Sequence, residues 1–216
     1  HRESLCLASQ GVLLNIQNFQ LAEWQQRFVD EFVLSNSQRN MLVAAAGTGK
    51  TVTSIIAANQ KLKAGKSKRL AIVTELLALR DQWKYVAKEN GLNLADDVKG
   101  ISDRFNDGAS ITYQSLINEE RLELLQEQAN DGGLLVIIDE VDRYQKRAIE
   151  VCDEIISRNK SNQCLFISRT PLIGYSLDWT HEFGKEYLFE PNIIQLPETE
   201  IQVARFSPSL KLLSHL

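Results

Sequence analysis

A glycine-containing segment that ends in a lysine and a threonine is the first feature of the sequence that could do chemistry. An apolar stretch at 41–44 leads into Gly-Thr-Gly-Lys-Thr at 47–51, and a helix-compatible stretch follows at 52–64. Strand, glycine-containing loop and helix, in this order, are the context that a phosphate-binding loop requires. Glycines let backbone N–H groups turn toward phosphate oxygens, and the helix adds the positive end of its dipole. Lys50 would then reach the β- and γ-phosphates, and the Thr51 hydroxyl would hold Mg²⁺.

We therefore predict that this loop binds a nucleotide. The residues expected around the phosphates are Ala46, Gly47, Thr48, Gly49, Lys50 and Thr51. The first position of the usual pattern holds Ala44 in place of glycine, which we interpret as a variant of the same loop. The alternative is an accidental glycine turn before a helix, and it is disfavoured because the pattern is rare by chance in a chain of this length.

Two adjacent acidic residues form the second feature. Asp139 and Glu140 directly follow 134–138, a run of five apolar residues typical of a central parallel strand. Ligands bind at the carboxyl ends of the strands in an open α/β sheet. Asp139 is therefore expected to share the Mg²⁺ with Thr51, and Glu140 is expected to polarise the water that attacks the γ-phosphate. The alternative, a simple solvated loop, loses weight because a phosphate-binding loop precedes it.

The elements that must position these residues alternate along the chain. Buried strands are expected at 41–44, 70–73, 110–112, 134–138 and 164–167, with a short one near 98–101. Helical spacing or turn signals predict helices at 21–33, 52–64, 75–90 with Leu76 on its inner face, 116–129, and after the acidic pair. This alternation predicts an α/β fold with a mostly parallel central sheet and helices on both faces. We expect Lys50 and Asp139 to converge on one metal-triphosphate from the tips of neighbouring strands.

Composition sets broad limits. The chain has 216 residues, 44% of them apolar, with a formal net charge of −4. No window resembles a membrane span or a signal peptide. Cys6, Cys152 and Cys164 have no paired spacing, which favours a reducing intracellular compartment, cytoplasmic or in the nucleoid or nucleus. The basic run at 61–69 is interpreted as a solvated helix end and loop. Trp24 and Trp83, at helical spacing, are interpreted as core residues.

Several segments together resemble the ordered motifs of the superfamily-two helicases and translocases. Asp-Glu-Val-Asp at 139–142 looks like motif II and 44–51 like motif I. Gln25, within 21–25, resembles the residue that reads adenine in that family. The segments 72–74 and 79–83 are similar to motif Ia and its following helix, and 111–116 includes the Thr-Tyr-Gln-Ser-Leu of translocases. Ser-Arg-Thr-Pro at 168–171 resembles motif III, except that Arg169 replaces a small residue.

The resemblance implies a first, RecA-like lobe with a P-loop NTPase fold that binds ATP and Mg²⁺, closest to restriction-type or DEAD-like motors. It implies coupling roles for Ser168, Arg169 and Thr170, and nucleic-acid contacts, with DNA weakly favoured over RNA. The residues implied in those contacts are Thr74, Arg80, Thr112 and Tyr113. It also implies a second RecA-like lobe of the same parent chain that supplies arginine fingers, so this chain alone is expected to be poorly active.

The expected organisation is an extension at 1–20, the ATP-binding lobe at 21–180 and a segment at 181–216 that leads to an absent second lobe. The chain begins at His1 without an initiator methionine, so we expect a fragment of a longer protein. Two other functions stay open. One is a self-contained P-loop ATPase acting on protein partners, and the other is a degenerate ATP-binding scaffold in which Arg169 marks lost coupling.

Overall fold

The computed structural model describes residues 20–44, 46–141 and 145–169, and a six-stranded sheet lies at the centre of this part of the chain. In the order in which they lie side by side, the strands are β1 (Arg39–Val43), β6 (Gln163–Ser168), β5 (Leu134–Ile138), β2 (Arg69–Thr74), β4 (Gly108–Thr112) and β3 (Leu94–Ala95). Every pairing between these strands is parallel. The predicted α/β fold with a parallel sheet is therefore confirmed.

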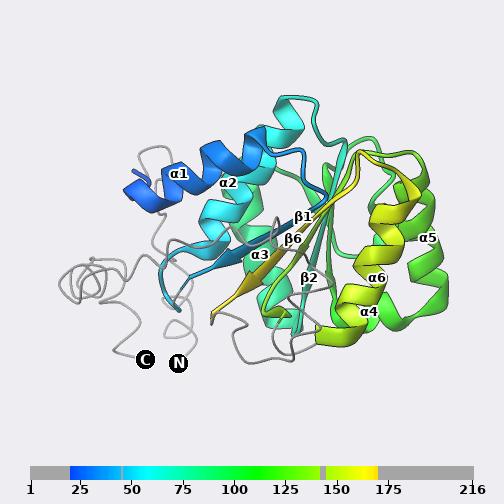
Figure 1. The fold of residues 1–216 in the computed structure, drawn as a ribbon. Helices are drawn as coiled ribbons and strands as arrows, with labels where there is room; N and C mark the ends of the chain where they lie inside the picture. Colours follow the sequence, from blue (N-terminus) through cyan, green and yellow to red (C-terminus); the bar gives the residue numbers. More distant parts are fainter. Residues whose placement is uncertain (1–19, 45, 142–144, 170–216) are drawn as a thin grey trace, which may run out of the picture.

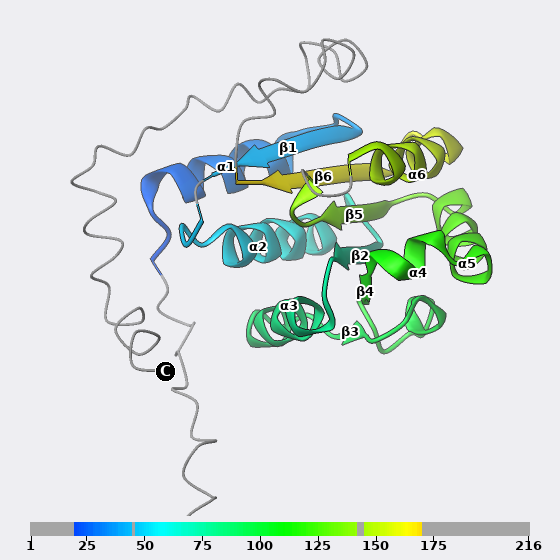
Figure 2. The same cartoon turned by 90° about the horizontal axis from the view of Figure 1, so that it is seen from below.

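Helices cover both faces of the sheet (Figures 1 and 2). One face carries α1 (Glu23–Leu34), α2 (Lys50–Lys63) and α3 (Leu77–Glu89), and the other carries α4 (Tyr113–Ile117), α5 (Glu119–Asn130) and α6 (Gln145–Arg158). Strand β5 explains this arrangement, because all five of its residues are buried. Leu135 and Ile137 pack toward the α1–α3 layer, whereas Leu134, Val136 and Ile138 pack toward the α5–α6 layer.

Several predicted boundaries are wrong, and local capping explains two of them. The strand expected near 98–101 is a short 3₁₀ helix, Val98–Gly100, because the Asp97 side chain accepts a hydrogen bond from the Lys99 backbone N–H. The helix expected at 116–129 is divided into α4 and α5, because the Asn118 side chain caps α5 by accepting from the Arg121 N–H. Leu76 precedes α3 and is 55% exposed, so it does not face the core.

The basic run was also misinterpreted at one position. Lys61 is fully buried in the last turn of α2 rather than solvated. Its ammonium donates to the Ser35 carbonyl oxygen (3.0 Å) and to Gln163 Oε1 (2.6 Å), and it lies 4.5 Å from the centre of the Phe32 ring. Burial, and then the like charge of Lys66, lowers the pKa of Lys61 from 10.5 to about 8.

Other expectations lie outside the described residues. These are the N-terminal extension apart from its last residue, the C-terminal segment at 181–216, and Thr170. Cys164 is a buried free thiol in β6. In the described part of the chain, no helix is both long and apolar enough to cross a membrane.

Candidate active site

The loop after β1 turns at two glycines before it enters a helix. Gly47 and Gly49 both have positive φ, 77° and 88°, a region that favours glycine. Gly49 is the N-cap of α2, so the helix begins at Lys50 with its first N–H groups directed at the loop. The Lys50 ammonium donates to the Ala44 carbonyl oxygen at 2.7 Å, so the lysine side chain reaches back to the start of the loop that precedes its helix. Thr51 follows, partly buried, in the first turn of α2.

The side chain of Gln25 connects helix α1 to this loop by a hydrogen bond. The Gln25 side chain is 3% exposed; its Nε2 donates to the Thr48 carbonyl oxygen at 2.9 Å, and its Oε1 accepts from the Ala22 N–H at 2.9 Å. A Cβ atom on Gly49 would lie 2.7 Å from Gln25 Nε2. Glycine is therefore favoured at this position for two reasons, its positive φ and the close approach of the amide.

The acidic pair begins where β5 ends. The backbone N–H of Asp139 still pairs with the Val73 carbonyl oxygen at 3.0 Å, so its position is set by the sheet. Trp83 Nε1 donates to Asp139 Oδ2 at 2.8 Å. Burial raises the pKa of the Asp139 carboxyl, and the charge of Glu140 adds to this rise. The Trp83 hydrogen bond, a backbone hydrogen bond from Glu140 and the charge of Lys50 oppose it.

Glu140 has an unusual backbone and a charged partner. Its φ is 50°, whereas every other positive φ among the described residues belongs to a glycine. Its carboxylate forms an ion pair with the Arg169 guanidinium. The Glu140 side chain is 12% exposed and that of Arg169 is 47% exposed. The carboxylate expected to orient water is thus held by the residue that departs from the motif III pattern.

These groups follow the carboxyl ends of three strands of one sheet. Strand β6 lies between β1 and β5, so the expectation that Lys50 and Asp139 follow neighbouring strands is wrong. The intervening strand ends level with β1, because Val43 pairs with Ser168 in register and the Ala44 N–H reaches the Ser168 carbonyl oxygen at 3.2 Å. Lys50 and Asp139 nevertheless follow the carboxyl ends of their strands at the same edge of the parallel sheet, and the charge of Lys50 is the smallest of the influences on the pKa of the Asp139 carboxyl.

The chemistry of this edge suits Mg²⁺ held together with phosphate. A buried carboxylate is costly to keep ionised unless a cation lies close by. In the described part of the chain no three His, Cys, Asp or Glu side chains gather into a metal cluster. Mg²⁺ at nucleotide sites is usually held by one or two protein oxygens, phosphates and water rather than by an all-protein cage. Asp139 and Thr51 fit that pattern by type and by place.

Comparison with known proteins identifies the family. Residues 15–173 match the family model described as "Type III restriction enzyme, res subunit". The chain belongs to this family. No curated protein shows significant sequence similarity to the chain. The family and the RecA-like sheet make it an N-terminal lobe of the superfamily-two helicases and translocases, as the motifs predicted.

A solved ATPase core resembles this lobe in fold. The SWI2/SNF2 ATPase core of Sulfolobus solfataricus, solved in complex with double-stranded DNA, is 18% identical with a TM-score of 0.53. That match covers 71% of this chain and 33% of the other, so the lobe spans about a third of that core. A nuclease-deletion mutant of the Type ISP restriction-modification enzyme LlaGI, in complex with a DNA substrate mimic, is 18% identical with a TM-score of 0.49. That match covers 77% of this chain and 19% of the other.

Three of the four residues predicted to contact nucleic acid in this lobe lie at the ends of β2 and β4, and the fourth, Arg80, lies in α3. Thr74 is buried, and its hydroxyl donates to the carbonyl oxygens of Leu76 (3.2 Å) and Ile111 (3.4 Å). Thr112 and Tyr113 are partly buried where β4 passes into α4, and the Thr112 hydroxyl is 3.5 Å from that of Ser115.

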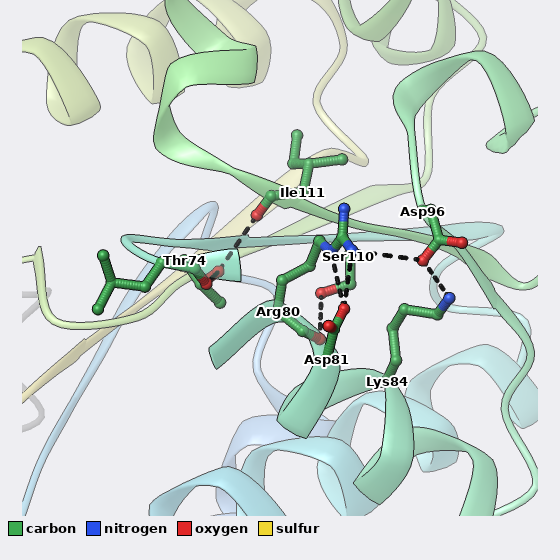
Figure 3. Close-up of polar contacts among 8 residues, drawn as sticks. Thr74, Arg80, Asp81, Lys84, Asp96, Ser110 and Ile111 are labelled. Carbon is green, nitrogen blue, oxygen red and sulfur yellow. Dashed lines mark hydrogen bonds and ion pairs between the residues drawn. The ribbon is translucent and has the colours of Figure 1, made fainter. Parts of the chain in front are cut away.

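Arg80, on α3, already forms ion pairs with acidic side chains of this lobe (Figure 3). Its guanidinium pairs with Asp81 at 2.8 Å and approaches Asp96 at 4.0 Å, and Asp96 also binds Lys84. The Arg80 backbone carbonyl oxygen accepts from the Ser110 hydroxyl at 3.3 Å. Contacts of these residues with nucleic acid stay predictions.

Trp83 is the site residue that the sequence did not reveal. Its ring is in the core, as expected, with 1% exposure. The indole N–H, however, binds the acid expected to hold the metal. A buried tryptophan usually finds an acceptor for its N–H. That rule signals that an acceptor exists, but it does not say which residue supplies it.

Proposed function

We propose that this chain is the ATP-binding lobe of a motor that hydrolyses ATP to move on nucleic acid. The observation that supports the proposal best is that the glycine loop with Lys50 and the acid Asp139 follow the carboxyl ends of β1 and β5, at the same edge of one parallel sheet. A lysine from a glycine loop and an acid from a buried strand are the two protein groups that such sites direct at a metal-bound triphosphate.

Each residue has a distinct role in the proposed reaction. The N–H groups at the start of α2 and the Lys50 ammonium bind the phosphates and neutralise the charge that develops on the γ-phosphate. Gln25 contacts the adenine and supports the loop. Thr51 and Asp139 would hold Mg²⁺, which would supply positive charge against the phosphates. Glu140 orients the water in line with the bond that breaks, once its carboxylate has left Arg169.

The nucleic acid that we propose is DNA, with RNA the less favoured alternative. The S. solfataricus ATPase core that resembles this lobe was solved on double-stranded DNA, which supports this choice. We also propose that a second RecA-like lobe of the parent chain completes the site with an arginine. Without that arginine, hydrolysis falls by a factor of order a thousand or more. An intracellular location, in the cytoplasm, nucleoid or nucleus, follows from these substrates.

Titration with a labelled ATP analogue in Mg²⁺ tests the proposal. The chain binds the analogue saturably, and Lys50→Ala weakens binding roughly ten- to a hundredfold, because charge-assisted hydrogen bonds to phosphate contribute about 1.5 to 3 kcal/mol. Lys63→Ala is the matched control, since it removes an exposed lysine from the far end of the same helix. Absence of saturable binding, or equal binding by Lys50→Ala and the unchanged chain, contradicts the proposal.

The ion pair between Arg169 and Glu140 favours a second candidate, an ATP-binding scaffold that does not use hydrolysis. In that case the arginine holds the water-orienting carboxylate permanently. Normal ATP binding by the parent protein, with hydrolysis that neither DNA nor RNA stimulates, would support the scaffold. Vigorous turnover by this chain alone, insensitive to nucleic acid, would instead favour a self-contained ATPase acting on protein partners.

A further inference from the structure

Trp83 connects the helix layer to the acidic end of β5. It lies in α3, 56 residues before Asp139 in sequence, and is 1% exposed. Its only polar side-chain atom, Nε1, donates to Asp139 Oδ2 at 2.8 Å. The contact is therefore a full hydrogen bond between a core side chain and the carboxylate to which the proposed function assigns the metal.

This hydrogen bond restricts the rotation of the Asp139 carboxylate, which would otherwise turn freely. The terminal torsion of an aspartate is broad, so its carboxylate turns easily when nothing holds it. An indole N–H only donates, and it occupies one lone-pair direction of Oδ2. A carboxylate has about four such directions, so the others are left to accept from the Glu140 backbone and to coordinate a cation. The bond fixes the orientation of the carboxylate without using its capacity to bind metal.

The donor itself is held firmly. The indole belongs to the apolar cluster between the sheet and helices α1 to α3, which includes Ile72 of β2 and Ile137 of β5. Side chains in such a core are closely packed, so the ring cannot follow the carboxylate if the carboxylate turns. A phenylalanine here would fill most of the same space and donate nothing.

We propose that Trp83 is a positioning residue that orients the Asp139 carboxylate for Mg²⁺. The proposal rests on the proposed function, because it requires that Asp139 binds the metal of a metal–nucleotide complex. Hydrogen-bond partners of metal ligands typically contribute ten- to a hundredfold to metal affinity. The indole N–H therefore strengthens the metal-dependent part of nucleotide binding and leaves the metal-independent part unchanged.

Calorimetric titration of the whole chain with ADP, in Mg²⁺ and in EDTA, separates these two parts. For Trp83→Phe we expect binding in Mg²⁺ to weaken about tenfold, and binding in EDTA to stay within about twofold of the unchanged chain. Val86→Ala is the matched control, because Val86 is one turn further along α3 and packs on the same cluster. Val86→Ala removes part of the packing of α3 but keeps the indole N–H of Trp83. The ratio of ADP affinity in Mg²⁺ to ADP affinity in EDTA therefore stays unchanged.

A measurement on the unchanged chain keeps the proposal testable if Trp83→Phe does not fold. The sequence has three tryptophans, so its ¹H–¹⁵N spectrum carries three indole N–H signals, which Trp24→Phe and Trp179→Phe assign by elimination. The Trp83 signal shifts when Mg²⁺ is added to the ADP complex, because the accepting oxygen then belongs to a metal-bound carboxylate.

The outcomes are distinct. Equal weakening of Trp83→Phe in both buffers, or a Trp83 signal that ignores Mg²⁺, overturns the positioning role and leaves the proposed function intact. If the unchanged chain binds ADP in neither buffer, the proposed function fails and the role of Trp83 fails with it.

Discussion

Helix α2 begins at Lys50 and has Lys61 in its last turn, and these two lysines have opposite environments. Lys50 begins the helix at the carboxyl edge of the sheet, partly exposed, with its ammonium on the Ala44 carbonyl oxygen of its own loop. Lys61 is fully buried in the last turn, where Ser35, Gln163 and the Phe32 ring surround its ammonium. The first bonds within the loop that precedes its own helix, whereas the second joins elements that are far apart in sequence.

This difference shows how one sheet separates function from stability. At the amino edge, Gln163 Nε2 also donates to the carbonyl oxygens of Ser35 (3.1 Å) and Ser37 (2.8 Å), so the polar groups around Lys61 satisfy one another. At the carboxyl edge, the charge of Lys50 lowers the pKa of the Asp139 carboxyl. We expect changes at the amino edge to alter stability and changes at the carboxyl edge to alter nucleotide affinity.

Lys61→Ala tests this separation with the largest expected effect. The change leaves a cavity where the lysine stem packed and removes the donor from a buried acceptor, Gln163 Oε1, and from a partly buried one, the Ser35 carbonyl oxygen, so the free energy of unfolding falls by roughly 3 to 4 kcal/mol. Nucleotide affinity stays unchanged in buffer where the variant is folded. Urea denaturation with a nucleotide titration measures both quantities, and Lys50→Ala is expected to give the opposite pair of results. A loss of affinity in Lys61→Ala would show that the two edges are coupled.

The pH dependence of stability gives the next largest effect. The pKa of Lys61 is about 8 in the folded chain and 10.5 ordinarily, so between these values the unfolded chain binds more protons. Stability from this group is therefore lowest below pH 8, and it rises as the pH increases toward 10.5. From pH 8 to pH 10 we expect a gain of about 2 kcal/mol that Lys61→Met lacks. Denaturation of both proteins at several pH values gives the difference between their free energies of unfolding. The contributions of the other lysines are the same in both proteins and drop out of this difference. Parallel pH profiles would mean that the buried ammonium keeps an ordinary pKa.

The two lysines also mark what the sequence can predict. The strands around the site were predictable, because 41–44 and 134–138 are apolar runs that turn polar where the sheet ends. Lys50 was predictable, because its partners lie in its own loop. The partners of Lys61 are 26 and 102 residues away, and that of Trp83 is 56 residues away, so no local pattern points to them.

The order of the strands was not predictable in the same way. An apolar run shows that a strand is buried on both faces, but it does not name the neighbours of that strand. Strand β6 was therefore expected in the sheet but not between β1 and β5. This placement brings Arg169 to Glu140, a contact that could not be foreseen from the substitution in the motif alone.

The smallest predicted effect lies within the carboxyl edge and sharpens the comparison there. Gly47 and Gly49 have similar positive φ values, but an added Cβ meets nothing within 4 Å at Gly47, and at Gly49 it lies 2.7 Å from Gln25 Nε2. Gly47→Ala therefore introduces backbone strain of about 1 kcal/mol. Gly49→Ala adds the loss of the hydrogen bond from Gln25 to Thr48, worth about 1 kcal/mol more.

Thermal unfolding and nucleotide titration of both glycine variants measure this difference. We expect Gly49→Ala to be less stable than Gly47→Ala by about 1 kcal/mol. We also expect it to bind nucleotide more weakly, because the hydrogen bond from Gln25 of α1 is displaced. The double variant Gln25→Ala, Gly49→Ala lacks the clashing amide. Its free energy of unfolding should therefore differ from that of Gln25→Ala only by the backbone strain of one left-handed alanine. If the two single variants are equally stable, Gln25 yields to the new methyl group at no cost, and the carboxyl edge is as adaptable around Gly49 as it is around Gly47.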